Sequence, residues 1–278
     1  MNGDEARSIE LLELARTQHA AGEYREALAT ARDVIARLGE SPVAASLTAS
    51  SVASATAAAC LVQLGDPGGA LDIVRSARAI PGHAGSVESR LPLDVAEGEI
   101  LADTGRVELA IPLLEAAAHA TRAGALPSCA TTLVVLGVAY IAAGRFADAI
   151  AVANDAAAMQ DRAPALLDRA RPHVVIARAA VALGDLARAE SAYVTALEIA
   201  QTGEERGNEG WAAFAGGALA LRRGDRAEGE QRLDDAQEIA EELGMMRLVE
   251  HCRALLRVAR VRQMDEERTS DSRRRSES

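Results

Sequence analysis

The chain has 278 residues and a formal net charge of −11, and all 30 of its basic residues are arginine. Because there is no lysine, sites that need one, such as a P-loop or a Schiff base, are excluded. A pI near 5.0 argues against binding to nucleic acid or to anionic membranes, since both require a cationic protein surface. The 62 alanines and the aromatic content of 2 % favour closely packed helices.

Three cysteines, Cys60, Cys129 and Cys252, are far apart in the sequence and odd in number. This spacing fits neither a disulfide framework nor a zinc site. We expect small buried apolar residues in a reducing compartment, and hence a cytoplasmic location. The uncharged stretches 41–65 and 123–144 reach the length of a membrane span. Both fall in register with the repeat described next, so we expect neither to cross a membrane.

A short turn sequence that contains glycine recurs six times along the chain. The intervals between successive glycines are 43, 40, 39, 40 and 40 residues. Glycine readily adopts the left-handed conformation that ends a helix, so each copy is predicted to be a helix, a tight turn and an antiparallel helix. The turn glycines are Gly22, Gly65, Gly105, Gly144, Gly184 and Gly224.

Two columns of small residues accompany these glycines in every copy. Small residues on facing sides of two helices let the helix axes approach closely, and stacking of successive hairpins then completes the core. Seven residues before the glycine stand Ala15, Ala58, Gly98, Gly137, Ala177 and Gly217. Five residues after it stand Ala27, Ala70, Ala110, Ala149, Ala189 and Gly229.

The fourth copy reads Leu136-Gly137-Val138-Ala139-Tyr140, followed by Gly144, Phe146, Ala149 and Ala156, and it resembles the tetratricopeptide repeat. The period of about 40 residues exceeds the 34 residues usual in that family. In this longer period the repeat is similar to the sensory repeats of bacterial multidomain regulators. The resemblance covers roughly residues 6–244 and implies a fold but no particular function.

We therefore expect an all-α, right-handed α–α superhelix of six hairpins and a C-terminal capping helix, over residues 1–263. The remaining residues, 264–278, are strongly charged and are predicted to be a disordered tail or linker. The predicted hairpins span about 4–40, 44–82, 86–123, 127–162, 164–202 and 205–243, and the predicted cap spans 245–263.

No sequence motif for an enzyme is recognisable. The five histidines are not paired at ligand spacing, and the adjacent carboxylates Asp234–Asp235 and Glu241–Glu242 point in different directions on a helix. We therefore predict no catalytic residue, no metal site and no cofactor.

The resemblance implies that the first helix of each hairpin lines a concave groove for a partner. The predicted groove is apolar with few charges, which favours an amphipathic or hydrophobic peptide. Its pattern differs from that of grooves that clamp a C-terminal carboxylate, so we do not expect that ligand. Trp211 and Phe214 form the single aromatic cluster in the sequence. Two roles remain open for it: the rings anchor the partner, or they pack between the fifth and sixth hairpins. The predicted groove residues are Leu12, Arg16, His19, Ala59, Val62, Val95, Glu99, Val134, Val138, Ile141, Val174, Arg178, Val181, Trp211, Phe214 and Leu221.

Three functions remain open. The first is a non-catalytic scaffold that binds a protein or peptide partner in bacterial regulation or signalling, without nucleic acid or membrane. The second is a sensory input domain of a larger regulator, such as a diguanylate cyclase or a helix-turn-helix transcription factor, whose output domain lies outside these residues. The third and most remote is an all-α enzyme.

Overall fold

A computed structural model of the chain describes residues 3–38, 44–80, 86–124, 126, 128–162 and 168–276. Within these residues it contains thirteen helices and no strand, which confirms the predicted all-α fold. Predicted hairpin limits at residues 40, 82, 127 and 164 lie outside the described residues. The helices are α1 (Gly3–Ala21), α2 (Tyr24–Leu38), α3 (Ala44–Gln63), α4 (Pro67–Arg78), α5 (Val87–Asp103), α6 (Val107–Ala123), α7 (Cys129–Ala142), α8 (Phe146–Asp161), α9 (Arg171–Leu183), α10 (Leu186–Thr202), α11 (Arg206–Arg223), α12 (Arg226–Leu243) and α13 (Met246–Ser276).

Glycine turns separate the two helices of every hairpin, as the sequence predicts. All six turn glycines have a positive φ, between 73° at Gly144 and 92° at Gly22. A side chain at such a position would strain the backbone, which is why the turn requires glycine. A seventh, Gly244, with φ of 70°, ends α12 and precedes α13.

Both columns of small residues are buried where the two helices of a hairpin meet. A Cβ atom at Gly98 would lie 2.5 Å from Cγ of Leu114, and one at Gly217 would lie 2.8 Å from Cγ of Leu233. These positions therefore allow α5 to approach α6, and α11 to approach α12, more closely than any larger residue permits. The sequence prediction of close helix pairs is confirmed.

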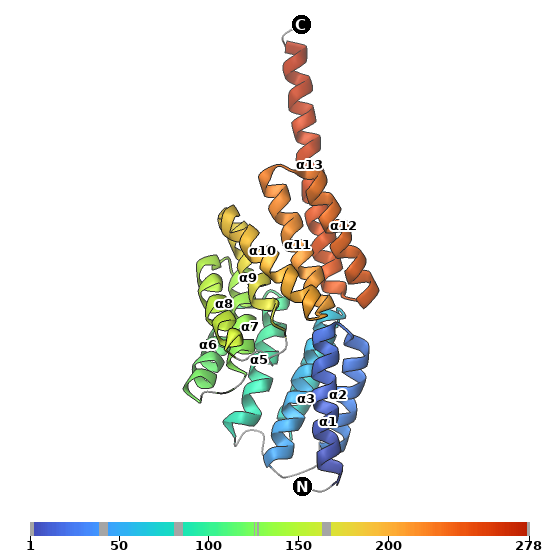
Figure 1. Cartoon of the computed structure of the whole chain (residues 1–278), viewed down its shortest axis with the longest axis vertical. Coiled ribbons are helices and arrows are strands. Elements are labelled where there is room, and N and C mark those ends of the chain that lie inside the picture. Colours follow the sequence, from blue (N-terminus) through green and yellow to red (C-terminus); the bar gives the residue numbers. More distant parts are fainter. Residues whose placement is uncertain are drawn as a thin grey trace.

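The two ends of the superhelix meet. Figure 1 shows that the hairpins pass around one side of the molecule, so that α11–α13 lie next to the ends of α1–α3. Contacts join α1 to α11 and α3 to α13. At the first turn, a Cβ atom on Gly22 would lie 2.9 Å from Leu243 and 3.1 Å from the backbone nitrogen of Gly207. The first two hairpins therefore contact the sixth hairpin and the cap directly.

Helix α13 caps the last hairpin and then continues. Its first turns bury Leu248, Val249, Cys252 and Leu256 against the preceding helices. The helix extends to Ser276, beyond the other helices in Figure 1. Residues 264–276 are thus helical in the structure, whereas the sequence predicts a disordered tail or linker over 264–278. Arginine, glutamate and glutamine favour helix, and the packed first half removes the cost of nucleation.

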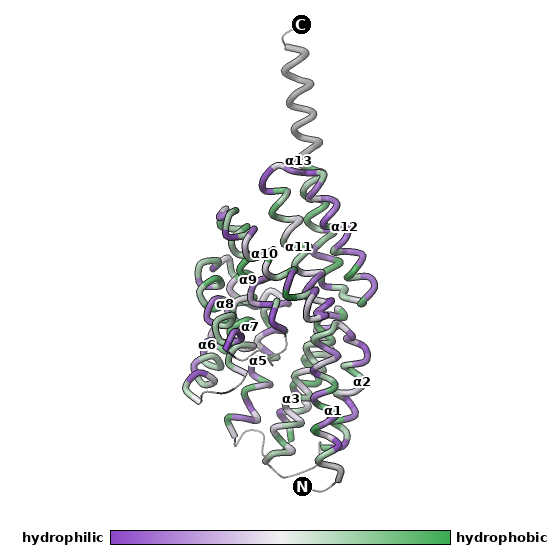
Figure 2. The backbone as a smooth tube through the Cα atoms, viewed as in Figure 1, coloured by the Kyte–Doolittle hydropathy of each residue, from purple (hydrophilic) through white to green (hydrophobic). Residues whose placement is uncertain are grey.

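One stretch of the described residues, Ala45–Gln63 in α3, is long and apolar enough to cross a membrane. Figure 2 shows this helix mainly in neutral and hydrophobic colours. About three fifths of the stretch, 61 %, is buried inside the structure, where α3 packs against α2, α4 and α5. This burial is that of a core helix. The three cysteines are also buried and free, as expected.

Candidate binding cavity on the inner face

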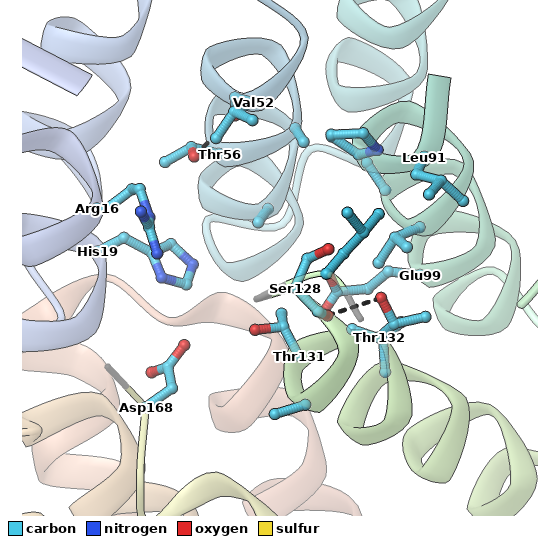
Figure 3. A pocket seen from close by; sticks show the side chains of 18 of the residues that line it. Arg16, His19, Val52, Thr56, Leu91, Glu99, Ser128, Thr131, Thr132 and Asp168 are labelled. Atoms are coloured by element: carbon cyan, nitrogen blue, oxygen red, sulfur yellow. Dashed lines mark hydrogen bonds between the residues drawn. The ribbon is translucent and has the colours of Figure 1, made fainter. Parts of the chain in front are cut away.

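A cavity of about 470 Å³ lies on the inner face, between the first helices of four consecutive hairpins. Figure 3 shows Arg16 and His19 on α1 facing Asp168, with α3, α5 and α7 forming the remaining walls. Hydroxyl and apolar side chains alternate on these walls. The lining includes Thr48, Val52, Ala55, Thr56, Ala59, Leu91, Val95, Ser128, Thr131, Thr132 and Val135.

A buried ion pair crosses the inner face beside this cavity. Nη2 of Arg171, at the start of α9, lies 2.6 Å from Oε1 of Glu99 on α5. The exposed fractions of these side chains are 17 % for Arg171 and 7 % for Glu99. Burial disfavours the charged form of Arg171, but the carboxylates of Glu99 and Asp168 keep its pKa above the ordinary value. Glu99 is therefore a paired charge and is not available to a ligand as a free carboxylate.

Glu205 fixes the segment that carries Asp168 and Arg171 to the cavity. Its carboxylate accepts hydrogen bonds from the backbone nitrogen of Arg169, at 2.7 Å, and from that of Ala170, at 3.0 Å. Burial raises the pKa of Glu205, although these donors act in the opposite direction. Asp168 has a φ of 59°, uncommon for a residue with a side chain, and the carboxylate of Glu205 holds the backbone that follows it.

A second, smaller cavity of about 40 Å³ adjoins the first. The two share His19, Asp168 and Arg171 in their walls. The smaller cavity reaches toward the contact between the two ends of the superhelix. Its other lining residues are Tyr24, Gln63, Val138, Val174, Val175, Arg178, Asn208, Trp211 and Arg247.

Trp211 stands in the wall of the smaller cavity with 8 % of its surface exposed. Its ring makes edge contacts with Phe214, at 5.9 Å between centroids, and with His251 of α13, at 5.3 Å. The guanidinium carbon of Arg178 lies 4.8 Å from the Trp211 ring centroid. The structure thus places this aromatic cluster between α9, α11 and α13. Of the two roles that the sequence left open, the burial of Trp211 favours packing between hairpins.

The predicted groove residues divide into three groups. Arg16, His19, Ala59, Val95 and Glu99 line the larger cavity. His19, Val138, Val174, Arg178 and Trp211 line the smaller one. The others belong to the core and line neither cavity, because the tight winding packs their faces against neighbouring helices: Leu12, Val62, Val134 and Val181 are buried, and Ile141, Phe214 and Leu221 are partly buried.

Several lining residues were not among the predicted groove residues. Thr131 and Thr132, in the first turn of α7, are two of them. Arg247 belongs to the cap and reaches the inner face only because the superhelix closes. Asp168 belongs to the linker before α9, which the repeat pattern does not describe, and Arg171 is the first residue of α9. Among the described residues, no group of three or more His, Cys, Asp or Glu is placed to hold a metal ion.

One hairpin matches a known repeat family. Residues 170–202, which include α9 and α10, match the family model described as tetratricopeptide repeat. The fifth hairpin is therefore a tetratricopeptide repeat. No curated protein sequence matches the chain.

Solved structures of several repeat proteins share this fold. A Rap protein complexed with Competence and Sporulation Factor superposes with a TM-score of 0.68 and 17 % identity, over 89 % of this chain and 69 % of that chain. The apo form of RapI superposes with a TM-score of 0.56 and 14 % identity, over 91 % of this chain and 74 % of that chain. BtubC from P. vanneervenii superposes with a TM-score of 0.54 and 18 % identity, over 82 % of this chain and 92 % of that chain. At these identities the likeness concerns the fold alone.

Proposed function

We propose that this protein is a tetratricopeptide repeat scaffold without catalytic activity, which binds a short peptide, or an unfolded segment of a protein partner, in its larger inner cavity. The observation that carries this proposal is the cavity of about 470 Å³ between four successive first helices. Its volume lies within the range of about 300–1,000 Å³ that is usual for ligand sites. We place the protein in the bacterial cytoplasm, in regulation or signalling.

The lining of the cavity supports a peptide. The hydroxyls of Thr56 on α3 and Thr132 on α7 donate to backbone carbonyls of their own helices, so they can accept hydrogen bonds from the N–H groups of an extended peptide. Apolar side chains such as Val52, Leu91 and Val95 between them suit the apolar side chains of a peptide. A scaffold role also agrees with the Rap structure, which was solved in complex with Competence and Sporulation Factor.

A mixed library of hexapeptides tests this function. The protein is incubated with the library, and retained peptides are identified by mass spectrometry after gel filtration. The variant Ala59→Phe projects a ring into the larger cavity and is expected to abolish retention. The matched control is Ala29→Phe, on the exposed face of α2, which is expected to retain the same peptides as the unmodified protein. Equal retention by both variants would place the binding site elsewhere.

A second candidate function is a sensory input domain of a larger regulator. The second half of α13 favours it, because this helix leaves the solenoid as a continuous element that can transmit a movement of the last hairpin (Figure 1). A stop codon directly after the codon for Ser278 in the source gene would exclude this candidate. In that case the scaffold function alone would remain.

A further inference from the structure

The smaller cavity lies near the place where the two ends of the superhelix meet. Its volume is about 40 Å³, and its wall includes side chains from α1, α2 and α3, from α9 and α11, and from the cap α13. A water molecule needs about 10–15 Å³ of cavity space. The smaller cavity therefore admits a single small ion with one or two water molecules, and it is too small for the end of a peptide.

Three arginine side chains line the smaller cavity, and two of them have carboxylate partners. The guanidinium group of Arg171 lies 2.6 Å from the carboxylate of Glu99, and that of Arg247 lies 2.5 Å from the carboxylate of Asp103. Among the residues that the structure describes, no carboxylate lies within ion-pair distance of Arg178. The cavity therefore contains one guanidinium group whose charge has no direct partner in the described part of the chain.

The surroundings of Arg178 make its positive charge costly. Burial, together with the nearby guanidinium groups of Arg247 and Arg171, lowers the pKa of Arg178 to about 9. The ring centroids of Trp211 and Phe214 lie 4.8 and 5.9 Å from the guanidinium carbon, and these contacts stabilise the cation. Neither ring replaces a full hydrogen-bond acceptor, so an anion beside Arg178 gains both the charge and the N–H donors.

Two further side chains in the wall can donate a hydrogen bond to an anion. Burial raises the pKa of Tyr24, so its hydroxyl group keeps its proton at neutral pH. Gln63 is 7 % exposed, and its Oε1 has no hydrogen-bond partner among the described residues. Rotation of this amide by half a turn therefore breaks no hydrogen bond of Oε1, and it brings the N–H donors of Nε2 to the place that Oε1 occupies.

The wall of the smaller cavity also contains the carboxylate of Asp168. Its negative charge acts to raise the pKa values of Arg171 and His19. The charges that act on the pKa of Arg178 are instead the positive ones of Arg247 and Arg171. Asp168 therefore does not compensate Arg178, and an anion is expected at the end of the cavity near Arg178.

We propose that the smaller cavity binds a single chloride ion, with Arg178 as its charged partner and Tyr24 and Gln63 as additional donors. Chloride is monatomic and only slightly larger than a water molecule, so it fits a cavity of this volume. The site goes beyond the proposed function, because the ion contacts no protein partner. It links the first two hairpins to the fifth, and so it stabilises the contact between the two ends of the superhelix.

Thermal unfolding in two salts tests the site. The protein is dialysed into sodium chloride or into sodium gluconate of the same ionic strength, and gluconate is too large for the cavity. Since an ion that binds only the folded protein stabilises it, we expect a melting temperature that is higher in chloride by at least about 2 °C. Equal melting temperatures in the two salts would overturn the proposal.

Bromide gives a direct measurement at Trp211, the single tryptophan, whose ring centroid lies 4.8 Å from the guanidinium carbon of Arg178. Bromide can replace chloride in such a site, and it quenches the fluorescence of an indole ring beside it. At constant ionic strength we expect quenching that saturates with the bromide concentration and that chloride reverses. Quenching that stays linear and does not respond to chloride arises from collisions alone and would contradict the proposed site.

The variant Arg178→Gln is expected to lose both the difference between the salts and the saturable quenching. Arg75→Gln, on exposed α4, is the matched control and should keep both. Tyr24→Phe removes one neutral donor and should raise the bromide concentration for half-maximal quenching by about three- to tenfold. If Arg178→Gln does not fold, Tyr24→Phe decides in its place. Saturable quenching that is unchanged in these variants would place the halide ion elsewhere on the protein, and so would overturn the assignment to this cavity.

Discussion

Asp103, the last residue of α5, forms an ion pair with Arg247 in the first turn of α13, with 2.5 Å between Oδ1 and Nε. The exposed fractions of the side chains are 16 % for Asp103 and 11 % for Arg247. The pair connects the third hairpin to the cap and helps to close the superhelix. Burial raises the pKa of Asp103, although Arg247 acts against this shift.

A double-mutant cycle with Asp103→Asn and Arg247→Gln should give a coupling free energy of about 1–3 kcal/mol in urea unfolding. Each single change leaves a buried charge without its partner, which costs more than removal of both. The exposed pair Arg122–Asp155, with 53 % and 59 % of the side chains exposed, is the control. Its coupling should stay below about 1 kcal/mol. Equal couplings for both pairs would mean that the closing contact is not desolvated.

The contact between the first and last hairpins can be tested at Gly207. A Cβ atom there would collide with Oη of Tyr24, so Gly207→Ala should lower the free energy of unfolding by about 1–3 kcal/mol. Tyr24→Phe should recover much of the loss in the double variant, because the next atom, Cζ, is 3.3 Å away. The measurement is urea unfolding of the three variants.

The control for Gly207 is Gly68→Ala in the first turn of α4. The nearest side-chain atom there is 3.6 Å from the added Cβ, so this change should be neutral or stabilising by up to about 1 kcal/mol. The interpretation of the closing contact fails if Gly207→Ala behaves like Gly68→Ala.

Crowding inside a hairpin gives a further prediction. Gly98→Ala should destabilise the protein by about 1–3 kcal/mol, because its Cβ would lie 2.5 Å from Cγ of the fully buried Leu114. A second change, Leu114→Val, makes room for this Cβ. The double variant should therefore be more stable than the sum of the two single effects predicts, as measured by thermal unfolding. If the effects of the two changes on stability simply add, α5 and α6 can separate at this contact without a cost in free energy.

The stability of the aromatic cluster should depend on pH through His251. Burial lowers the pKa of His251 to about 4, from an ordinary value of 6.5. Between these two values the unfolded chain binds a proton that the folded protein does not, so stability falls as the pH falls from about 6.5 to about 4. The contribution to the slope is at most about 1.4 kcal/mol per pH unit.

Replacement of His251 by Phe removes this contribution. His251→Phe should therefore have a shallower dependence of the free energy of unfolding on pH between 4.5 and 6.5. His119→Gln, on an exposed face of α6, is the control and should keep the slope of the unmodified protein. Parallel curves for the unmodified protein and His251→Phe would show that His251 takes up its proton as readily in the folded state.

The inner cavity was only partly predictable. Arg16, His19 and Glu99 were predicted as groove residues and do line the larger cavity. They could be predicted because they occupy equivalent positions, relative to the turn glycine, on the first helix of their hairpins. Arg247 and Gln63 were not predicted, since neither occupies such a position. Val62 and Val134 were placed in the groove because they occupy such positions, yet the structure buries them. Periodicity identifies a face of a helix, but it does not tell how tightly the next helix covers that face.

The sequence by itself determined the hairpins. The glycine at each turn sets the backbone conformation, and the small residues near it set the distance between the two helices. Both effects act within one hairpin, so the sequence of each copy is sufficient to predict its hairpin. Only the tertiary structure decided that the two ends of the superhelix meet, that Asp103 pairs with Arg247, and that Arg178 lies against the ring of Trp211. These outcomes depend on the summed rotation between hairpins, and small differences in linkers and packing accumulate over the whole array before its two ends meet.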